Sequence, residues 1–196
     1  MLHDWGSALG FDYAMRSDGR VRAIAFMEAL VPPVFPMESY AGMGPYEQLF
    51  RDLRDPTKGP GLVIEGNAFV EEVLPSAVLR DLTAAEMAAY RAPFAEPAAR
   101  KPVLVWPNQN PIGGEPEEVT AIVEAYGAWL RETEIPLLHL YASPGALNPP
   151  EVAAWLAANL KNIETAFVGG GLHYIQEDQP EAIGRAVADW LRRTGG

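Results

Sequence analysis

Cysteine is absent from the sequence, which excludes disulfide bonds and thiolate metal sites. Basic residues are few: 15 Lys and Arg stand against 26 Asp and Glu, and the net charge is −11. This charge disfavours nucleic acids and anionic membranes as partners, because both are polyanions. No apolar run approaches the ~20 residues of a membrane span, and the first residues do not have the pattern of a signal peptide. We therefore expect a cytoplasmic protein.

The sequence also lacks a Gly-x-Ser-x-Gly motif. In combination with the absence of cysteine, this disfavours a serine or cysteine hydrolase of the usual kind. A catalytic nucleophile would then have to come from another type of side chain. The 196 residues are enough for one domain with a sizeable core.

Three short apolar runs predict β-strands at residues 21–27, 135–142 and 163–168. The first two are nearly continuous in apolar residues, which is typical of strands buried on both faces. Apolar residues at helical spacing predict helices between and after the later strands. These helices are expected at 117–131, 151–160 and 181–193. Strands that alternate with helices indicate an α/β fold with a parallel sheet.

The middle of the chain, residues 31–111, is rich in proline and has little strand pattern. We expect helices here, one over 67–82 that is interrupted or kinked at Pro75 and one that begins at Thr83 with the form of a capping box. A helical segment between two strands of an α/β core is typical of a cap over the edge of the sheet where ligands bind. The predicted division is therefore a core of residues 1–30 and 112–196 and a helical cap of residues 31–111.

Asp4 is a candidate nucleophile, in the segment His3-Asp4-Trp5-Gly6-Ser7 that leads into a predicted helix. At a strand-to-helix turn, backbone N–H groups and the helix dipole stabilise a carboxylate as the anion. An anionic carboxylate in a dry pocket can attack carbon. The alternative is that Asp4 only caps the helix, and the spacing alone leaves both interpretations open.

His173 and Glu28 are two further candidates. His173 follows the last predicted strand and three glycines, where a histidine on a loop can serve as a general base. Glu28 ends the first predicted strand, where a lone acid can orient a histidine and stabilise its charged form. The alternatives are a solvated loop histidine and an ordinary acid at a strand end.

Other titratable groups near these candidates are expected to have structural roles. His139 lies within a predicted strand among leucines, and His3 adjoins the turn, which it would support by hydrogen bonding. Glu177 and Asp178 are expected to lie near the start of the last helix, where acidic side chains favour the helix dipole.

At these residues the sequence resembles the haloalkane dehalogenases, over nearly the whole chain. The matching segments are His3–Phe11, Phe26–Glu28, Asn67–Glu71, Trp106–Asn108 and Gly171–Asp178. The resemblance implies an α/β-hydrolase fold, a small haloalkane and water as substrates, and no metal or organic cofactor.

The resemblance also implies a role for each candidate. Asp4 would displace halide and form an alkyl ester, His173 would activate water to hydrolyse the ester, and Glu28 would orient His173 as the catalytic acid of one dehalogenase subgroup. Trp5 would donate its indole N–H to the halide and its backbone N–H to the oxyanion hole. The residues that match the lining of the apolar substrate pocket are Phe50, Phe69, Trp106, Pro107 and Leu147.

The sequence departs from the family at its beginning. Family members carry a long segment before the turn, with about half of the sheet and an asparagine that is the second halide donor. Asn108 and Asn110 match other positions. We therefore expect that half of the sheet is absent, that no strand precedes Asp4, and that the strand at 21–27 becomes an exposed edge. Either the chain is part of a longer enzyme, or it forms a homo-oligomer or binds a partner chain that covers this edge.

Two alternative functions follow from these observations. The chain could be an inactive or partner-dependent truncated dehalogenase homologue, because of the missing segment. It could also be an epoxide hydrolase or a luciferase-like relative, because those proteins share parts of the same scaffold.

Overall fold

A computed structural model describes residues 1–17 and 19–195. Its four strands form one sheet in the order β1-β2-β3-β4, and each neighbouring pair is parallel. The strands are β1 (Leu2–Asp4), β2 (Ile24–Ala29), β3 (Leu137–Pro144) and β4 (Ile163–Gly171). The predicted α/β fold with a parallel sheet is confirmed.

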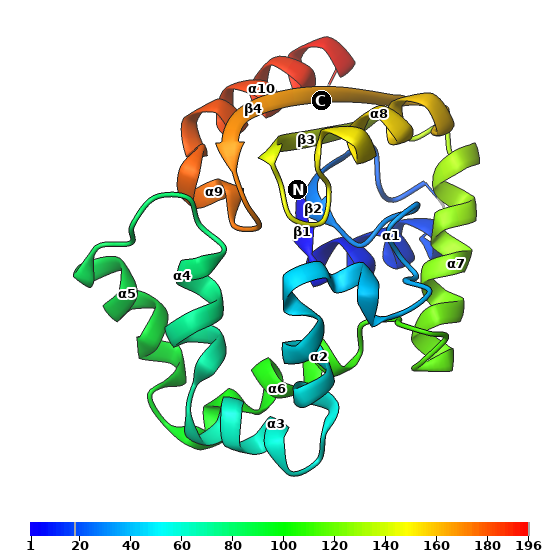
Figure 1. The fold of residues 1–196 in the computed structure, drawn as a ribbon. Helices are drawn as coiled ribbons and strands as arrows, with labels where there is room; N and C mark the ends of the chain where they lie inside the picture. Colours follow the sequence, from blue (N-terminus) through cyan, green and yellow to red (C-terminus); the bar gives the residue numbers. More distant parts are fainter. Residues whose placement is uncertain (18, 196) are drawn as a thin grey trace.

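Helices account for most of the remaining chain (Figure 1). The α-helices are α1 (Trp5–Arg16), α2 (Glu47–Arg54), α3 (Lys58–Pro60), α4 (Leu74–Ser76), α5 (Ala84–Arg91), α6 (Lys101–Asn108), α7 (Glu117–Glu132), α8 (Pro150–Asn159), α9 (Ile175–Asp178) and α10 (Pro180–Thr194). Shorter 3₁₀ and π turns are η1 (Tyr40–Tyr46), η2 (Gly61–Glu65), η3 (Phe69–Val73), η4 (Ala92–Phe94) and η5 (Pro97–Arg100). Among the described helices, none is long and apolar enough to cross a membrane.

Both faces of the sheet are covered by helices, as its apolar strands require. Alternate residues of β2 point to opposite faces, so Phe26 packs in one core cluster with residues of α1, α7 and α8. Met27 belongs to a second cluster, which contains Ile175 of α9 and Trp190 of α10. The sheet is therefore the middle layer of three.

The predicted helices after residue 111 agree with α7, α8 and α10 to within a residue or so at each end. The capping box at Thr83 is also confirmed: the Thr83 hydroxyl accepts from the Glu86 N–H, and the Glu86 carboxylate accepts from the Thr83 N–H. The prediction of a helix over 67–82, interrupted or kinked at Pro75, is confirmed only in its first part. The π segment ends at Val73 and α4 ends at Ser76, next to Pro75, and the chain then continues as turns and bends.

The prediction that no strand precedes Asp4 is wrong. The three residues of β1 pair with β2 in parallel, with Leu2 opposite Phe26 and His3 opposite Met27. β2 is therefore an interior strand and not an exposed edge. Three residues are too few to show a hydrophobic pattern, and β1 exists because its backbone groups pair with a neighbour that is distant in the sequence.

Residues between β2 and α7 form a separate group of helices. In Figure 1, α2 to α6 lie together below the sheet, whereas α1, α7, α8, α9 and α10 surround it. An isolated parallel bridge between Met37 and Ile112 joins the two ends of this segment beside the core. The division into a core and a cap of residues 31–111 stays a prediction.

Candidate active site

Asp4 ends β1 and directly precedes α1, in a backbone conformation that few residues adopt. Its φ is 47° and its ψ is −131°, a region that costs on the order of 1–3 kcal/mol for a residue with a side chain. Asp4 occupies the N-cap position, yet within the described chain its side chain forms no capping hydrogen bond. The capping interpretation therefore does not explain this residue, which lines a cavity.

The turn at Asp4 is held by a buried hydroxyl that sequence reasoning did not find. Ser7, in the first turn of α1, is fully buried. Its Oγ donates to the Asp4 carbonyl at 2.5 Å and accepts from the Leu30 N–H at 2.9 Å. Ser7 thus joins the turn to the residue that follows β2, which keeps the strained backbone in one position.

Glu28 lies in β2 with its side chain almost completely buried, 1% exposed. Its carboxylate accepts hydrogen bonds from the backbone N–H groups of three consecutive residues after β3, at 2.7–3.2 Å for the shorter contact of each. These residues are Ala146, Leu147 and Asn148. Backbone donors arranged in this way stabilise a buried carboxylate as the anion.

Asn148 fixes the loop that carries these donors. Its side-chain Oδ1 accepts from the Ala29 N–H at 2.6 Å, and its Nδ2 donates to the Ala29 carbonyl at 3.0 Å. Asn148 is fully buried. Ala29 and Asn148 are 119 positions apart, so a local sequence pattern does not predict their contact.

His173 lies between the two carboxylates. Its Nδ1 is 3.2 Å from Oε2 of Glu28, and its Nε2 is 3.5 Å from Oδ1 of Asp4. Burial lowers the pKa of the imidazole, but the hydrogen bond to Glu28 and the charges of Asp4 and Glu28 outweigh this effect, so the pKa is raised. The structure therefore brings together the three residues that the sequence analysis selected as a nucleophile, an acid and a base.

The other two histidines differ from His173 in their surroundings. His3 Nε2 donates to the His173 carbonyl at 2.9 Å, so it supports the loop of the base. Burial, together with the nearby His173, lowers the pKa of His3. His139 is fully buried and stacks on Phe26, and burial lowers its pKa to about 4. These surroundings fit the structural roles expected for His3 and His139.

A cavity of about 600 Å³ opens beside the three residues. Asp4, Trp5 and His173 line it from the side of the sheet. All five residues predicted for the substrate pocket also line it: Phe50, Phe69, Trp106, Pro107 and Leu147. The lining is mainly apolar, which suits a substrate with few polar groups.

Two tryptophans lie at this cavity. The ring centroids of Trp5 and Trp106 are 5.1 Å apart. Trp5 is also the first residue of α1, so its backbone N–H is one of the donors that a helix leaves unpaired at its N-terminus. Trp5 can therefore offer two N–H groups close to Asp4, one from the indole and one from the backbone.

Asn110 is a polar residue in this apolar lining. It is 7% exposed and contacts the cavity, and Arg54 donates a hydrogen bond to its backbone carbonyl. Asn108 is not among the cavity-lining residues. Within the described residues, no group of three or more His, Cys, Asp or Glu side chains could hold a metal ion.

Comparison with known proteins agrees with this geometry. A family model described as alpha/beta hydrolase fold matches residues 3–180. A haloalkane dehalogenase from Sphingobium indicum is 44% identical over 98% of this chain, and one from Mesorhizobium japonicum is 45% identical over 97%. The crystal structure of haloalkane dehalogenase DbeA from Bradyrhizobium elkani superposes with a TM-score of 0.93 at 43% identity, over 98% of this chain and 66% of that one.

These matches define the class of the protein: the chain belongs to the α/β-hydrolase fold family. Within that family, the relatives that it matches at about 44% identity are haloalkane dehalogenases. The chain spans 64% of the length of the Sphingobium relative and 62% of the Mesorhizobium relative.

Proposed function

We propose that the protein is a haloalkane dehalogenase that converts a small haloalkane and water into an alcohol, a halide ion and a proton. The observation that carries the proposal is the position of His173 between Asp4 and Glu28 at the wall of an apolar cavity. The names of the relatives support the same reaction.

In the first step, a carboxylate oxygen of Asp4 attacks the carbon that bears the halogen. The carbon–oxygen bond of an ester forms, the carbon–halogen bond breaks, and the halide leaves with the bonding electrons. The indole N–H of Trp5 hydrogen-bonds to the departing halide. The proposal is supported by the position of Asp4 in the wall of the mainly apolar cavity and by the lack of a capping hydrogen bond to its side chain within the described residues.

In the second step, His173 removes a proton from water, and the hydroxide adds to the carboxyl carbon of the ester. The resulting oxyanion is stabilised by backbone donors that include the N–H of Trp5. When the intermediate collapses, the bond between the carboxyl carbon and the alkyl group's oxygen breaks, and His173 gives its proton to the departing alkoxide, which leaves as the alcohol. The Asp4 carboxyl group then releases the remaining proton of the water to solvent and is again a carboxylate. Glu28 orients the imidazole and stabilises its charged form.

The electrostatics of the site favour this order of steps. In the free enzyme the negative charge of Asp4 helps to raise the pKa of His173. Esterification removes that charge, so the pKa of His173 falls once the ester has formed. His173 is then a neutral base at the stage at which it must accept a proton.

We also propose that residues 31–111 act as a helical cap. This segment supplies four of the five predicted pocket residues, namely Phe50, Phe69, Trp106 and Pro107. A cap that closes over an apolar cavity excludes water from the nucleophile until the halide has left.

Bromide release from 1,2-dibromoethane tests the proposed function. Asp4→Asn should lower the rate by about 10³-fold or more, because the amide is not a nucleophile. Asp12→Asn is a matched control, since Asp12 lies in α1, the helix that directly follows Asp4, and forms an ion pair with the exposed Arg16. Its rate should equal that of the unmodified protein.

An Asp4→Asn variant that releases bromide at the full rate would contradict the mechanism. Formation of a diol from styrene oxide without any bromide release would replace the proposal with an epoxide hydrolase.

A further inference from the structure

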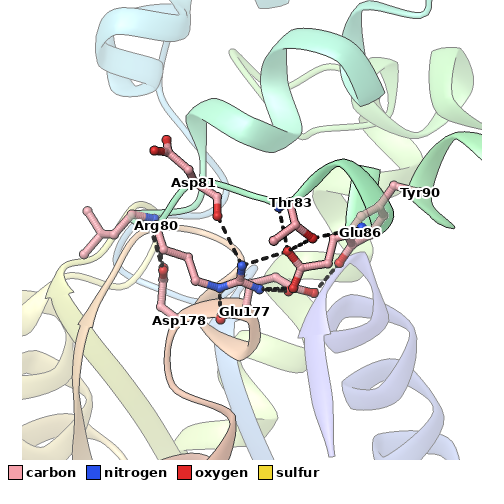
Figure 2. A network of polar contacts seen from close by, with 8 residues as sticks. Arg80, Asp81, Thr83, Glu86, Tyr90, Glu177 and Asp178 are labelled. Carbon is pink, nitrogen blue, oxygen red and sulfur yellow. Dashed lines mark hydrogen bonds and ion pairs between the residues drawn. The ribbon is translucent and has the colours of Figure 1, made fainter. Parts of the chain in front are cut away.

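A polar network joins the segment after His173 to the helices of residues 31–111 (Figure 2). Arg80 is at its centre. The Arg80 Nε donates to the Glu177 carbonyl at 2.8 Å, and Nη2 donates to Oε2 of the Glu177 carboxylate at 2.8 Å. The same guanidinium binds both carboxylate oxygens of Glu86 at 2.8 and 3.0 Å. Tyr90 OH donates to the other oxygen of Glu177 at 2.5 Å.

Backbone groups add a second connection between the same two segments. The N–H groups of His173 and Tyr174 both donate to the Ala77 carbonyl at 3.1 Å. The Arg80 N–H donates to the Asp178 carboxylate at 3.1 Å. Glu177 and Asp178 lie just before α10, near the start of the last helix as expected, and both side chains in addition bind residues of the distant segment 77–90.

We propose that Arg80 is a positioning residue for His173, a role that rests on the proposed function of His173 as the base. His173 is followed after one residue by α9, and Glu177 lies in that short helix. When Arg80 binds Glu177, it holds α9 in place, and α9 fixes where the loop of His173 ends. The imidazole must keep its contacts with both Glu28 and the ester at Asp4.

The network is suited to this role because its charge state is stable. Hydrogen bonds from Arg80 and Thr83 lower the pKa of Glu86 to about 2. Burial and the hydrogen bond to Glu177 raise the pKa of Tyr90 to about 12. Near neutral pH, Glu86 therefore stays anionic and Tyr90 stays neutral, so the network keeps the same contacts while His173 gains and loses its proton.

The prediction distinguishes the two chemical steps. Asp4 acts in the first step without His173, whereas the second step needs a correctly placed imidazole. A displacement of about 1 Å can slow a reaction by about 100-fold. Arg80→Met should therefore leave the first burst of one bromide per active site almost unchanged and slow the following steady-state release by about tenfold or more.

Rapid-quench measurement of bromide, with purified full-length protein and 1,2-dibromoethane, gives both rates. Arg80→Lys should recover part of the steady-state rate, since lysine keeps the charge but not the fork of donors. Arg91→Met is the matched control: Arg91 forms a similar double contact with Glu71 in the same group of helices, away from α9. It should change neither rate.

A steady-state rate of Arg80→Met within twofold of the unmodified protein would overturn the proposal. A bromide burst that decreases by the same factor as the steady-state rate would also overturn the proposal. If Arg80→Met does not fold, Glu177→Gln removes the same ion pair from the other side, and the same two outcomes apply.

A failure of the proposed dehalogenase function can be distinguished from a failure of the role proposed for Arg80. If the unmodified protein releases no bromide, the reaction is wrong, but titration of the His173 imidazole by NMR still tests the positioning role. A loosened contact with Glu28 should lower the pKa of His173 in Arg80→Met, and an unchanged titration would overturn the inference.

Discussion

The turn at Asp4 and the loop at His173 bring their side chains to the same place, yet different contacts hold them. The turn is held from within the core: β1 pairs with β2, and the buried Ser7 hydroxyl joins Asp4 to the residue after β2. The loop accepts a hydrogen bond from the sheet, from His3 of β1, and is in addition held from residues 31–111, by the ion pair of Arg80 and by the Ala77 carbonyl.

This difference has a consequence for the proposed reaction. Hydrogen bonds in the core are shielded from water, and breaking one leaves a buried polar group without a partner, which is costly. A partly exposed ion pair contributes little to stability and is screened by salt. Arg80 and Glu86 are each 37% exposed, and Ser7 is not exposed at all. The first step should therefore tolerate changes in Arg80 and Glu86 that slow the second.

The largest effect on the steady-state rate is expected from a change in Glu28, the buried residue of β2 that contacts His173. Glu28→Gln removes the charge that three backbone N–H groups bind, and it weakens the orientation of His173. The steady-state rate should fall by about 10²- to 10⁴-fold while the bromide burst persists. The pKa of His173 should also fall, so the acidic limb of the pH–rate profile should shift to lower pH. Rapid-quench and pH–rate measurements check both expectations.

A Glu28→Gln variant with an unshifted acidic limb would contradict the role of Glu28 as the partner of His173. A burst that disappears together with the steady state would show that Glu28 also supports the turn, and the two segments would then not be independent.

A smaller effect on the reaction rates is expected from a change in Ser7, the residue that holds the turn at Asp4. Ser7→Ala leaves the buried Leu30 N–H without an acceptor, which should lower the free energy of unfolding by about 1–3 kcal/mol. Since Asp4 takes part in both steps, the burst rate and the steady-state rate should fall by the same factor. Chemical denaturation and rapid-quench assays measure the two effects.

Ser76→Ala is the matched control for Ser7→Ala. The Ser76 hydroxyl also donates to a backbone carbonyl, but the residue is exposed, so stability should change by less than about 0.5 kcal/mol. If Ser7→Ala slowed only the steady state, the proposed difference between turn and loop would be wrong.

The sequence was sufficient to predict the parts that have a local pattern. The apolar runs gave three of the four strands, and helical spacing located α7, α8 and α10. Glu28 and His173 follow predicted strands, and parallel strands bring their carboxyl ends to one edge, so the sequence indicated that these two side chains meet. Asp4 was selected from its position before a predicted helix, without a strand to place it. The pocket residues came from the family resemblance and not from the pattern of this chain.

The parts that were not predicted depend on contacts between distant residues. Backbone N–H groups bind Glu28, and any residue type except proline could supply them, so positions 146–148 carry no specific signal. Arg80 and Glu177 are 97 positions apart, and each looks like an ordinary surface charge in the sequence. β1 was missed for a similar reason, since it depends on pairing with β2.

The covalent ester is the central claim, and mass spectrometry of a His173→Gln variant tests it most directly. After incubation with 1-bromobutane and digestion, the peptide that contains Asp4 should carry one butyl group, because the ester forms but is not hydrolysed. The adduct should be absent from the double variant Asp4→Asn, His173→Gln. An unmodified Asp4 peptide in His173→Gln, from an enzyme whose unmodified form releases bromide from the same substrate, would contradict the account.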